Sequence, residues 1–171
     1  GSRTAAVGRI FYVLLEAFAL ALKERPELKA LVVYPSERIK AVLDAALERH
    51  PGLSDSITFT KNGKDTQPAR AVLMSSGTMS LAVALSGIPG AIVYRLNTLS
   101  YWIGRLVVKI PCIGIANILL ESQPHKEFIQ HESRADSLAT ELLHSMTDEA
   151  KRNAFESAQA LSDLLNPSEK R

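Results

Sequence analysis

The sequence has a single cysteine, Cys112, among its 171 residues. One thiol excludes a disulfide within the chain and fits a reducing compartment. The residues around it, Ile110, Pro111 and Ile113, carry no charge. Because reactive thiols usually sit in electropositive, exposed surroundings, we expect Cys112 to serve only in packing.

The sequence also lacks a large excess of either charge: the net charge is +2 at pH 7, and the basic residues form no block. This balance, without any RNA- or DNA-binding motif, argues against a nucleic-acid partner. No apolar run reaches the roughly 18–20 residues of a membrane span, and no signal peptide is recognisable. The length and the 46% hydrophobic content suit one domain with a substantial core.

Metal-binding patterns are missing as well: no cysteine cluster, carboxylate cluster or HxxxH spacing occurs, so no metal or other cofactor is expected. Histidines offer little towards catalysis. His50 is expected at the end of a helix, and His131 and His144 on solvated helices. His125 lies near an asparagine in an apolar segment, and we expect it at the surface.

The first half of the chain alternates short apolar strands with amphipathic segments. Helices are predicted at residues 4–23, 35–50 and 78–85, and strands at 28–34, 56–60, 71–75 and 91–94. Continuous apolar strands that alternate with helices are typical of a parallel sheet covered on both faces. The predicted fold is therefore α/β, with a Rossmann-like, doubly wound parallel sheet.

The second half is expected to be mostly helical. An amphipathic helix is predicted at residues 99–109, a strand or extended loop at 113–120 and a short helix at 124–130. Two further helices follow at residues 134–146 and 147–165. We assign residues 1–130 to a Rossmann-like domain and 131–171 to its helical extension.

A strand that feeds a helix through small residues stands at the centre of the chain. Ser76, Gly77 and Thr78 follow the strand at 71–75 and open the next helix. The free N–H groups and the positive dipole end of a helix bind anions, most often phosphate. Serine, glycine and threonine also begin ordinary helices, so this pattern alone leaves both interpretations open.

Three further polar side chains are candidates for the same site. Arg3 precedes the first helix and Arg95 follows the strand at 91–94, so both are expected at the edge where parallel sheets bind ligands. Either arginine can contact phosphate or serve the surface or the fold instead. Asn117 lies in an apolar segment, where its amide must bind a ligand or satisfy backbone groups.

Several strings occur in one order and spacing: GSR at 1–3, SSGTMSL at 75–81, GIPGAIVYR at 87–95, LSYWIGRLVVK at 99–109, IGIANIL at 113–119 and KEFIQ at 126–130. Together they resemble the C-terminal half of lipid-A-disaccharide synthase, a glycosyltransferase family of the two-Rossmann-domain GT-B type. The resemblance implies that this half holds the nucleotide-sugar. It also implies that the sheet's first strand and an N-terminal half, with the acceptor site and the catalytic base, lie outside this chain.

The resemblance implies transfer of 2,3-diacylglucosamine from its UDP derivative to 2,3-diacylglucosamine 1-phosphate, with release of UDP and without a cofactor. This chain is then inactive without the N-terminal half. Its expected partners are the UDP-sugar donor, the lipid acceptor, a membrane surface and a second copy, and its expected location is the cytoplasmic face of the inner membrane. The alternatives are a non-catalytic nucleotide-binding remnant and a related enzyme that uses another UDP-sugar.

Site residues follow from the same resemblance. The expected UDP-sugar ligands are Arg3, Ser76, Gly77, Thr78, Arg95, Asn117 and Gln123. The chain departs from the family at Ala82, where the family has a glutamate suited to the ribose hydroxyls. It departs again at Glu121, Ser122 and Gln123, where the family has Gly-Arg-Glu.

The predicted helix at 99–109 carries aromatic and basic residues together: Tyr101, Trp102, Arg105 and Lys109. Such residues sit at headgroup level and attract anionic lipid, so membrane contact is one interpretation. The other is a helix packed on the sheet with its basic residues in solvent.

Overall fold

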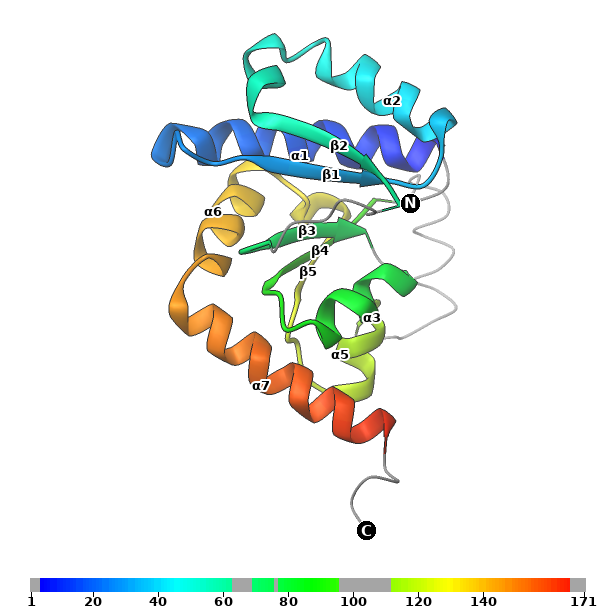
Figure 1. The fold of residues 1–171 in the computed structure, drawn as a ribbon, viewed down its shortest axis with the longest axis vertical. Coiled ribbons are helices and arrows are strands. Elements are labelled where there is room, and N and C mark those ends of the chain that lie inside the picture. The colour runs from blue at the N-terminus through cyan, green and yellow to red at the C-terminus, as the bar shows by residue number, and fades with distance from the viewer. Residues whose placement is uncertain (1–3, 63–68, 76, 96–111, 167–171) are drawn as a thin grey trace.

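A computed structural model describes residues 4–62, 69–75, 77–95 and 112–166, and these form an α/β fold (Figure 1). The first part contains α1 (Thr4–Glu24), β1 (Ala30–Tyr34), α2 (Glu37–Leu47), a 3₁₀ turn η1 (Pro51–Ser56) and β2 (Ile57–Lys61). The second contains β3 (Val72–Ser75), α3 (Thr78–Leu85), β4 (Gly90–Tyr94), α5 (Ile115–Leu120), β5 (Lys126–Ile129), η2 (Gln130–Glu132), α6 (Ala135–Ser145) and α7 (Asp148–Leu165).

The alternation predicted for the first half is confirmed, and so are the two C-terminal helices. Two later predictions are wrong. Residues 115–120 form the helix α5 instead of an extended segment, and residues 126–129 form the strand β5 instead of a helix. Short apolar runs fit either state by periodicity alone, so contacts distant in the sequence decided both. Lys126–Ile129 aligns with Ala91–Tyr94, and this ladder overrides the helix start signalled by Pro124.

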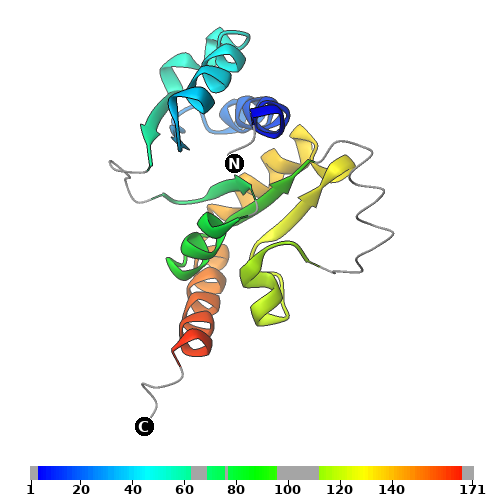
Figure 2. The same cartoon turned by 90° about the vertical axis from the view of Figure 1, so that its right-hand side faces the viewer.

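All the strand pairs are parallel, in two hydrogen-bonded sets rather than the single sheet that the sequence predicts. β1 pairs with β2, and β4 lies between β3 and β5. Among the described residues, no ladder joins β1 to β3. Both figures draw the two sets as separate groups on one side of α1 (Figures 1 and 2).

Helices cover the three-stranded set on both faces. Ala91 and Val93 of β4 pack with α1 and α6 on one face. Ile92 points to the other face, towards α5, where α3, α5 and α7 share a small core. Figure 2 looks almost along α1, which lies between α2 and α6. Helices on opposite faces give the Rossmann-like arrangement that the sequence predicts.

The helix α1 is long and apolar enough to cross a membrane by length and composition, which the sequence analysis did not anticipate. The core helix of a soluble protein passes the same test. Here one side of α1 packs against β1 and β2 and the neighbouring side against β4 and α6. Its buried residues are Ile10, Phe11, Val13, Leu15, Ala17, Phe18 and Ala21. The apolar stripe therefore forms the main core of this fold.

Candidate functional site

The carboxyl ends of β3, β4 and β5 lie at one edge of the sheet, where α/β folds bind ligands. Gly77 and Thr78 follow β3 there and open α3, and Arg95 follows β4. The structure thus brings three of the predicted residues to one edge. Gly77 has a φ of 152° with a ψ of −171°, a backbone region almost restricted to glycine. No side chain among the described residues caps α3, and the N–H groups that begin a helix can bind an anion or water.

Arg95 is anchored at this edge by a hydrogen bond. Its Nη2 donates to the carbonyl oxygen of Ser133 at 2.7 Å, and the hydroxyl of Ser133 donates to the carbonyl oxygen of Phe128 at 2.8 Å. The anchor joins the loop after β4 to the loop after β5. A guanidinium has five N–H donors, so one anchored donor is compatible with a second role towards an anion.

Asn117 is buried in α5 and bonds only with neighbouring protein groups in the contacts observed. Its Nδ2 donates to the carbonyl oxygen of His125 and to Oε1 of Glu127, both at 2.7 Å, and its Oδ1 accepts from the backbone N–H of His125 at 3.3 Å. Asn117 therefore bridges α5 to β5, which is the backbone-satisfying alternative of the sequence analysis. A ligand role for Asn117 stays a prediction.

Glu127 completes this network from the middle of β5. Its carboxylate accepts hydrogen bonds from the backbone N–H groups of Ile113 and Gly114 at 2.8 Å each, besides the one from Asn117. A carboxylate at the start of a helix satisfies free N–H groups and complements the helix dipole. The carboxylate of Glu127 therefore caps the start of α5.

His125 is buried, with 2% of its surface exposed, so its expected surface position is wrong. Its Nε2 lies 2.9 Å from the carbonyl oxygen of Ile88, which assigns the ring proton to Nε2. Burial lowers the pKa of His125, and the hydrogen bond to Ile88 opposes this only in part. Burial therefore favours the neutral imidazole, and its hydrogen bond ties the residue before β5 to the turn before β4.

The lowered pKa of His125 predicts that acid destabilises the fold. The unfolded chain binds this proton more readily than the folded one, so its contribution is fully present above pH 6.5 and is lost as the pH falls below that value. For one proton the upper limit of this slope is about 1.4 kcal/mol per pH unit. Urea unfolding between pH 5 and 7.5 measures it. The slope should flatten in His125→Gln and persist in the control His131→Gln, and equal slopes in both variants would refute this cause.

Gln123 lies at the opposite edge of the sheet from Gly77, Thr78 and Arg95. It lines an open pocket with Gly90 and Lys126, the first residues of β4 and β5, so it belongs to the amino edge. Its Nε2 also lies 3.8 Å from the sulfur of Cys112, which is partly buried. The structure does not bring Gln123 together with the carboxyl-edge residues, and its predicted role in UDP-sugar binding stays a prediction.

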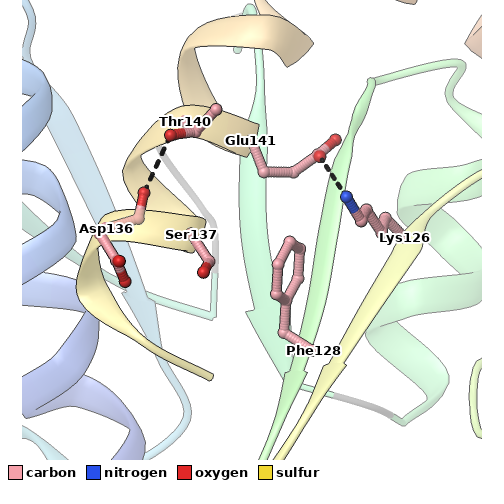
Figure 3. Close-up of a pocket in the computed structure, with 6 residues that line it drawn as sticks. All are labelled: Lys126, Phe128, Asp136, Ser137, Thr140 and Glu141. Atoms are coloured by element: carbon pink, nitrogen blue, oxygen red, sulfur yellow. Dashed lines mark hydrogen bonds and ion pairs between the residues drawn. The ribbon is translucent and has the colours of Figure 1, made fainter. Parts of the chain in front are cut away.

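A second pocket lies between β5 and α6 (Figure 3). Lys126 and Glu141 form an ion pair of 3.6 Å across one end, and Phe128 lies below them. At the other end, hydrogen bonds from Arg134 hold the pKa of Asp136 below its usual value. None of the predicted site residues lines this pocket.

Several predicted residues lie outside the described part of the chain. They are Arg3 and Ser76 of the anion site and Tyr101, Trp102, Arg105 and Lys109 of the membrane-contact helix. Across residues 4–62, 69–75, 77–95 and 112–166, no cluster of three or more histidine, cysteine, aspartate or glutamate side chains is placed to hold a metal ion.

The comparison with protein families tests the resemblance drawn from the motifs. The profile described as lipid-A-disaccharide synthetase matches residues 1–171, the whole chain. The chain belongs to this family. The resemblance carried by the motifs from GSR to KEFIQ is thereby confirmed.

Curated relatives agree with the family match. The chain is 30% identical over 156 residues to the lipid-A-disaccharide synthase of Nitrosococcus oceani, covering 91% of this chain and 40% of the relative. It is 31% identical to that of Methylobacillus flagellatus over 153 residues, which is 88% of this chain and 40% of the relative. The chain therefore spans about 40% of the length of these family members.

Sequence reasoning missed Glu127 and Gln130. The role of Glu127 was missed because residues 124–130 were expected to be helical. In the strand β5, its carboxylate instead lies at the start of α5. Gln130 comes directly after β5, at the same edge as Thr78 and Arg95, and has a φ of 54°. A left-handed backbone is uncommon at a non-glycine residue, and only the structure places Gln130 at this edge.

Proposed function

We propose that the chain is the donor-binding half of a lipid-A-disaccharide synthase. This enzyme transfers 2,3-diacylglucosamine from UDP-2,3-diacylglucosamine to 2,3-diacylglucosamine 1-phosphate and releases UDP. The main support is the family match over the whole chain, together with Gly77, Thr78 and Arg95 at the carboxyl edge of the sheet. The acceptor site and the catalytic base belong, in this proposal, to a separate N-terminal half, without which the chain is inactive.

The proposed reaction makes a diphosphate leaving group, so negative charge grows on phosphate oxygens in the transition state. Oriented N–H groups and cations that meet this charge lower the barrier. The start of α3 supplies backbone N–H groups, and Arg95 supplies a guanidinium that is already positioned by Ser133. Prior anchoring reduces the cost of ordering this side chain when UDP binds.

The nucleoside end of UDP is expected to lie along α3. Ala82, exposed one turn after Thr78, cannot accept hydrogen bonds from ribose hydroxyls. We propose that alanine at position 82 weakens the binding of ribose but leaves the contacts with the diphosphate intact. Membrane contact by residues 101–109 and a position at the cytoplasmic face of the inner membrane remain part of the proposal.

Calorimetric titration with UDP tests the site. Arg95→Ala removes a charge-assisted contact of about 1.5–3 kcal/mol, so the affinity should fall roughly 10- to 100-fold. Arg95→Lys keeps the charge and should lose less. Arg134→Ala is the matched control, because Arg134 pairs with Asp136 on α6. Ala82→Glu should tighten binding.

Melting curves of the same samples separate lost binding from lost folding. UDP affinity that is equal in the parent, Arg95→Ala and Arg134→Ala would overturn the role of Arg95. A folded parent chain that binds no UDP at millimolar concentration would overturn the donor-binding proposal.

A further inference from the structure

The amino edge of the three-stranded set, where β4 and β5 begin, contains an open pocket of about 340 Å³. This amino-edge pocket is bounded by the two strand starts, the C-terminal end of α6 and the N-terminal half of α7. Its volume is in the range of small-molecule sites, which combine apolar walls with a few polar groups. Proline and alanine side chains supply the apolar walls: Pro89, Pro124, Ala150 and Ala154.

Ser145, the last residue of α6, brings a hydroxyl without a hydrogen-bond partner to this pocket. Ser145 lines the pocket and is only 2% exposed. The hydroxyls of Thr140 on α6 and Ser157 on α7 donate to the carbonyl oxygen one turn earlier, at 3.0 and 2.8 Å. Within the described ranges, the hydroxyl of Ser145 makes no such bond, and it is not among the polar atoms sealed from solvent. Because buried hydroxyls almost always have a partner, this one is available to a ligand.

Glu141 lies one turn before Ser145 on α6 and also lines the pocket. Its side chain is mostly buried, with 15% exposed. The Nζ of Lys126 lies 3.6 Å from one carboxylate oxygen (Figure 3), and Nδ1 of His144 lies 3.7 Å from the other. Both distances exceed that of a hydrogen bond. In the part of the chain that the structure describes, the carboxylate is thus paired by charge only and can still accept hydrogen bonds from a ligand.

The charges of this pocket favour a neutral ligand. Lys126 and Glu141 carry opposite charges, so an anion would meet Glu141 and a cation would meet Lys126. His144 adds a charge only when it is protonated. The amides of Gln123 and Asn153, which also line the pocket, offer both donors and acceptors. Hydroxyl groups donate and accept as well, so a ligand with several hydroxyls matches this set.

We propose that the amino-edge pocket binds a neutral polyhydroxy molecule of the size of a hexose. Its hydroxyls donate to Glu141 and form hydrogen bonds with Ser145, Gln123 and Asn153, and its C–H groups contact the proline and alanine side chains. The pocket lies at the opposite edge of the sheet from Arg95. The proposal is therefore independent of the proposed function and of where UDP binds.

Nuclear magnetic resonance titrations of the full chain with three hexoses of different charge test the proposal. Glucose is neutral, glucosamine carries an ammonium group and glucuronate carries a carboxylate. Glucose should cause saturable shift changes at Gly90, Lys126, Ser145 and Asn153. It should bind at least about 5-fold more tightly than either charged hexose, because each of these meets a like charge. Saturating UDP should leave the affinity for glucose unchanged.

Removal of the hydroxyl and of the carboxylate tests each group. Ser145→Ala should lower the affinity for glucose roughly 3- to 10-fold through one lost hydrogen bond, without lowering the melting temperature. Ser162→Ala is the matched control, because Ser162 is exposed on α7 outside the pocket, and it should bind glucose like the parent. Glu141→Gln should weaken glucose binding and tighten glucuronate binding, because the charge of Lys126 is then unopposed.

Four results would overturn the proposal. The first is a folded parent chain without saturable changes at the pocket in tens of millimolar glucose. The second is tighter binding of either charged hexose than of glucose. The third is equal glucose affinity in the parent and in Ser145→Ala, and the fourth is displacement of glucose by UDP, which would make the pocket part of a nucleotide site.

Discussion

Replacing Gly90 with alanine should destabilise the protein by about 3–5 kcal/mol, because the new methyl group would overlap backbone atoms of the neighbouring strand. A Cβ at Gly90 would lie 1.9 Å from the carbonyl oxygen of Val72 and 2.8 Å from its carbonyl carbon. Val72 is the register partner of Gly90, and its N–H donates to the carbonyl oxygen of Pro89 at 3.0 Å. Relief of the overlap would have to displace the ladder between β3 and β4.

Urea unfolding measures this effect, and Gly8→Ala is its control. At Gly8 the nearest atom to a new Cβ is Cγ1 of Val42 at 3.5 Å, an ordinary contact. Gly8 lies inside α1, where alanine is favoured over glycine by about 0.5–1 kcal/mol, so this variant should become more stable. Loss of folded Gly90→Ala protein would agree with the prediction. A change of under 1 kcal/mol would contradict the close approach of the two strands.

Asn117→Ala should cost about 3 kcal/mol, because it breaks the bridge between α5 and β5. The substitution removes three hydrogen bonds and leaves the backbone N–H and carbonyl of His125 without their partner in a buried position. Each buried group left unsatisfied costs about 1–3 kcal/mol. For a chain of this size the melting temperature should fall by roughly 6–12 °C.

Asn153→Ala is the matched control, because Asn153 is exposed on α7. It should change stability by less than about 0.5 kcal/mol. The pair of variants also separates the two interpretations of Asn117. If Asn117→Ala keeps the melting temperature of the parent and loses only UDP affinity, the side chain serves a ligand and the structural bridge is refuted.

Much of the fold follows from the sequence, because apolar strands and amphipathic helices alternate clearly up to Tyr94. The strand at 91–94 is predicted almost to its first residue, since Pro89 and Gly90 end the preceding turn. The predictions failed at 113–120 and 124–130, where the apolar runs are short. The helix α5 is capped by a carboxylate from β5, and β5 is held as a strand by its pairing with β4. Contacts between residues distant in the sequence therefore set the secondary structure of both segments.

The site could be predicted where strand order alone sets position. Gly77 and Thr78 come within three residues of the end of β3, Arg95 directly follows β4, and parallel pairing brings them to one edge. Asn117 and Gln123 do not directly follow a clearly predicted strand, so strand order does not place them. In the structure, Asn117 is buried and bonds to His125, and Gln123 lies near Gly90 at the edge of the sheet where the strands begin. Their arrangement depends on packing that periodicity does not encode.

Nuclear magnetic resonance with isotope-labelled protein and added UDP tests the central claim, that the carboxyl edge holds the nucleotide. The account predicts that shift changes saturate with UDP and concentrate at Gly77, Thr78, Arg95 and Gln130, with Gly90 and Lys126 unaffected. Changes centred on Gly90 and Lys126, or no saturable changes in the folded chain, would contradict it.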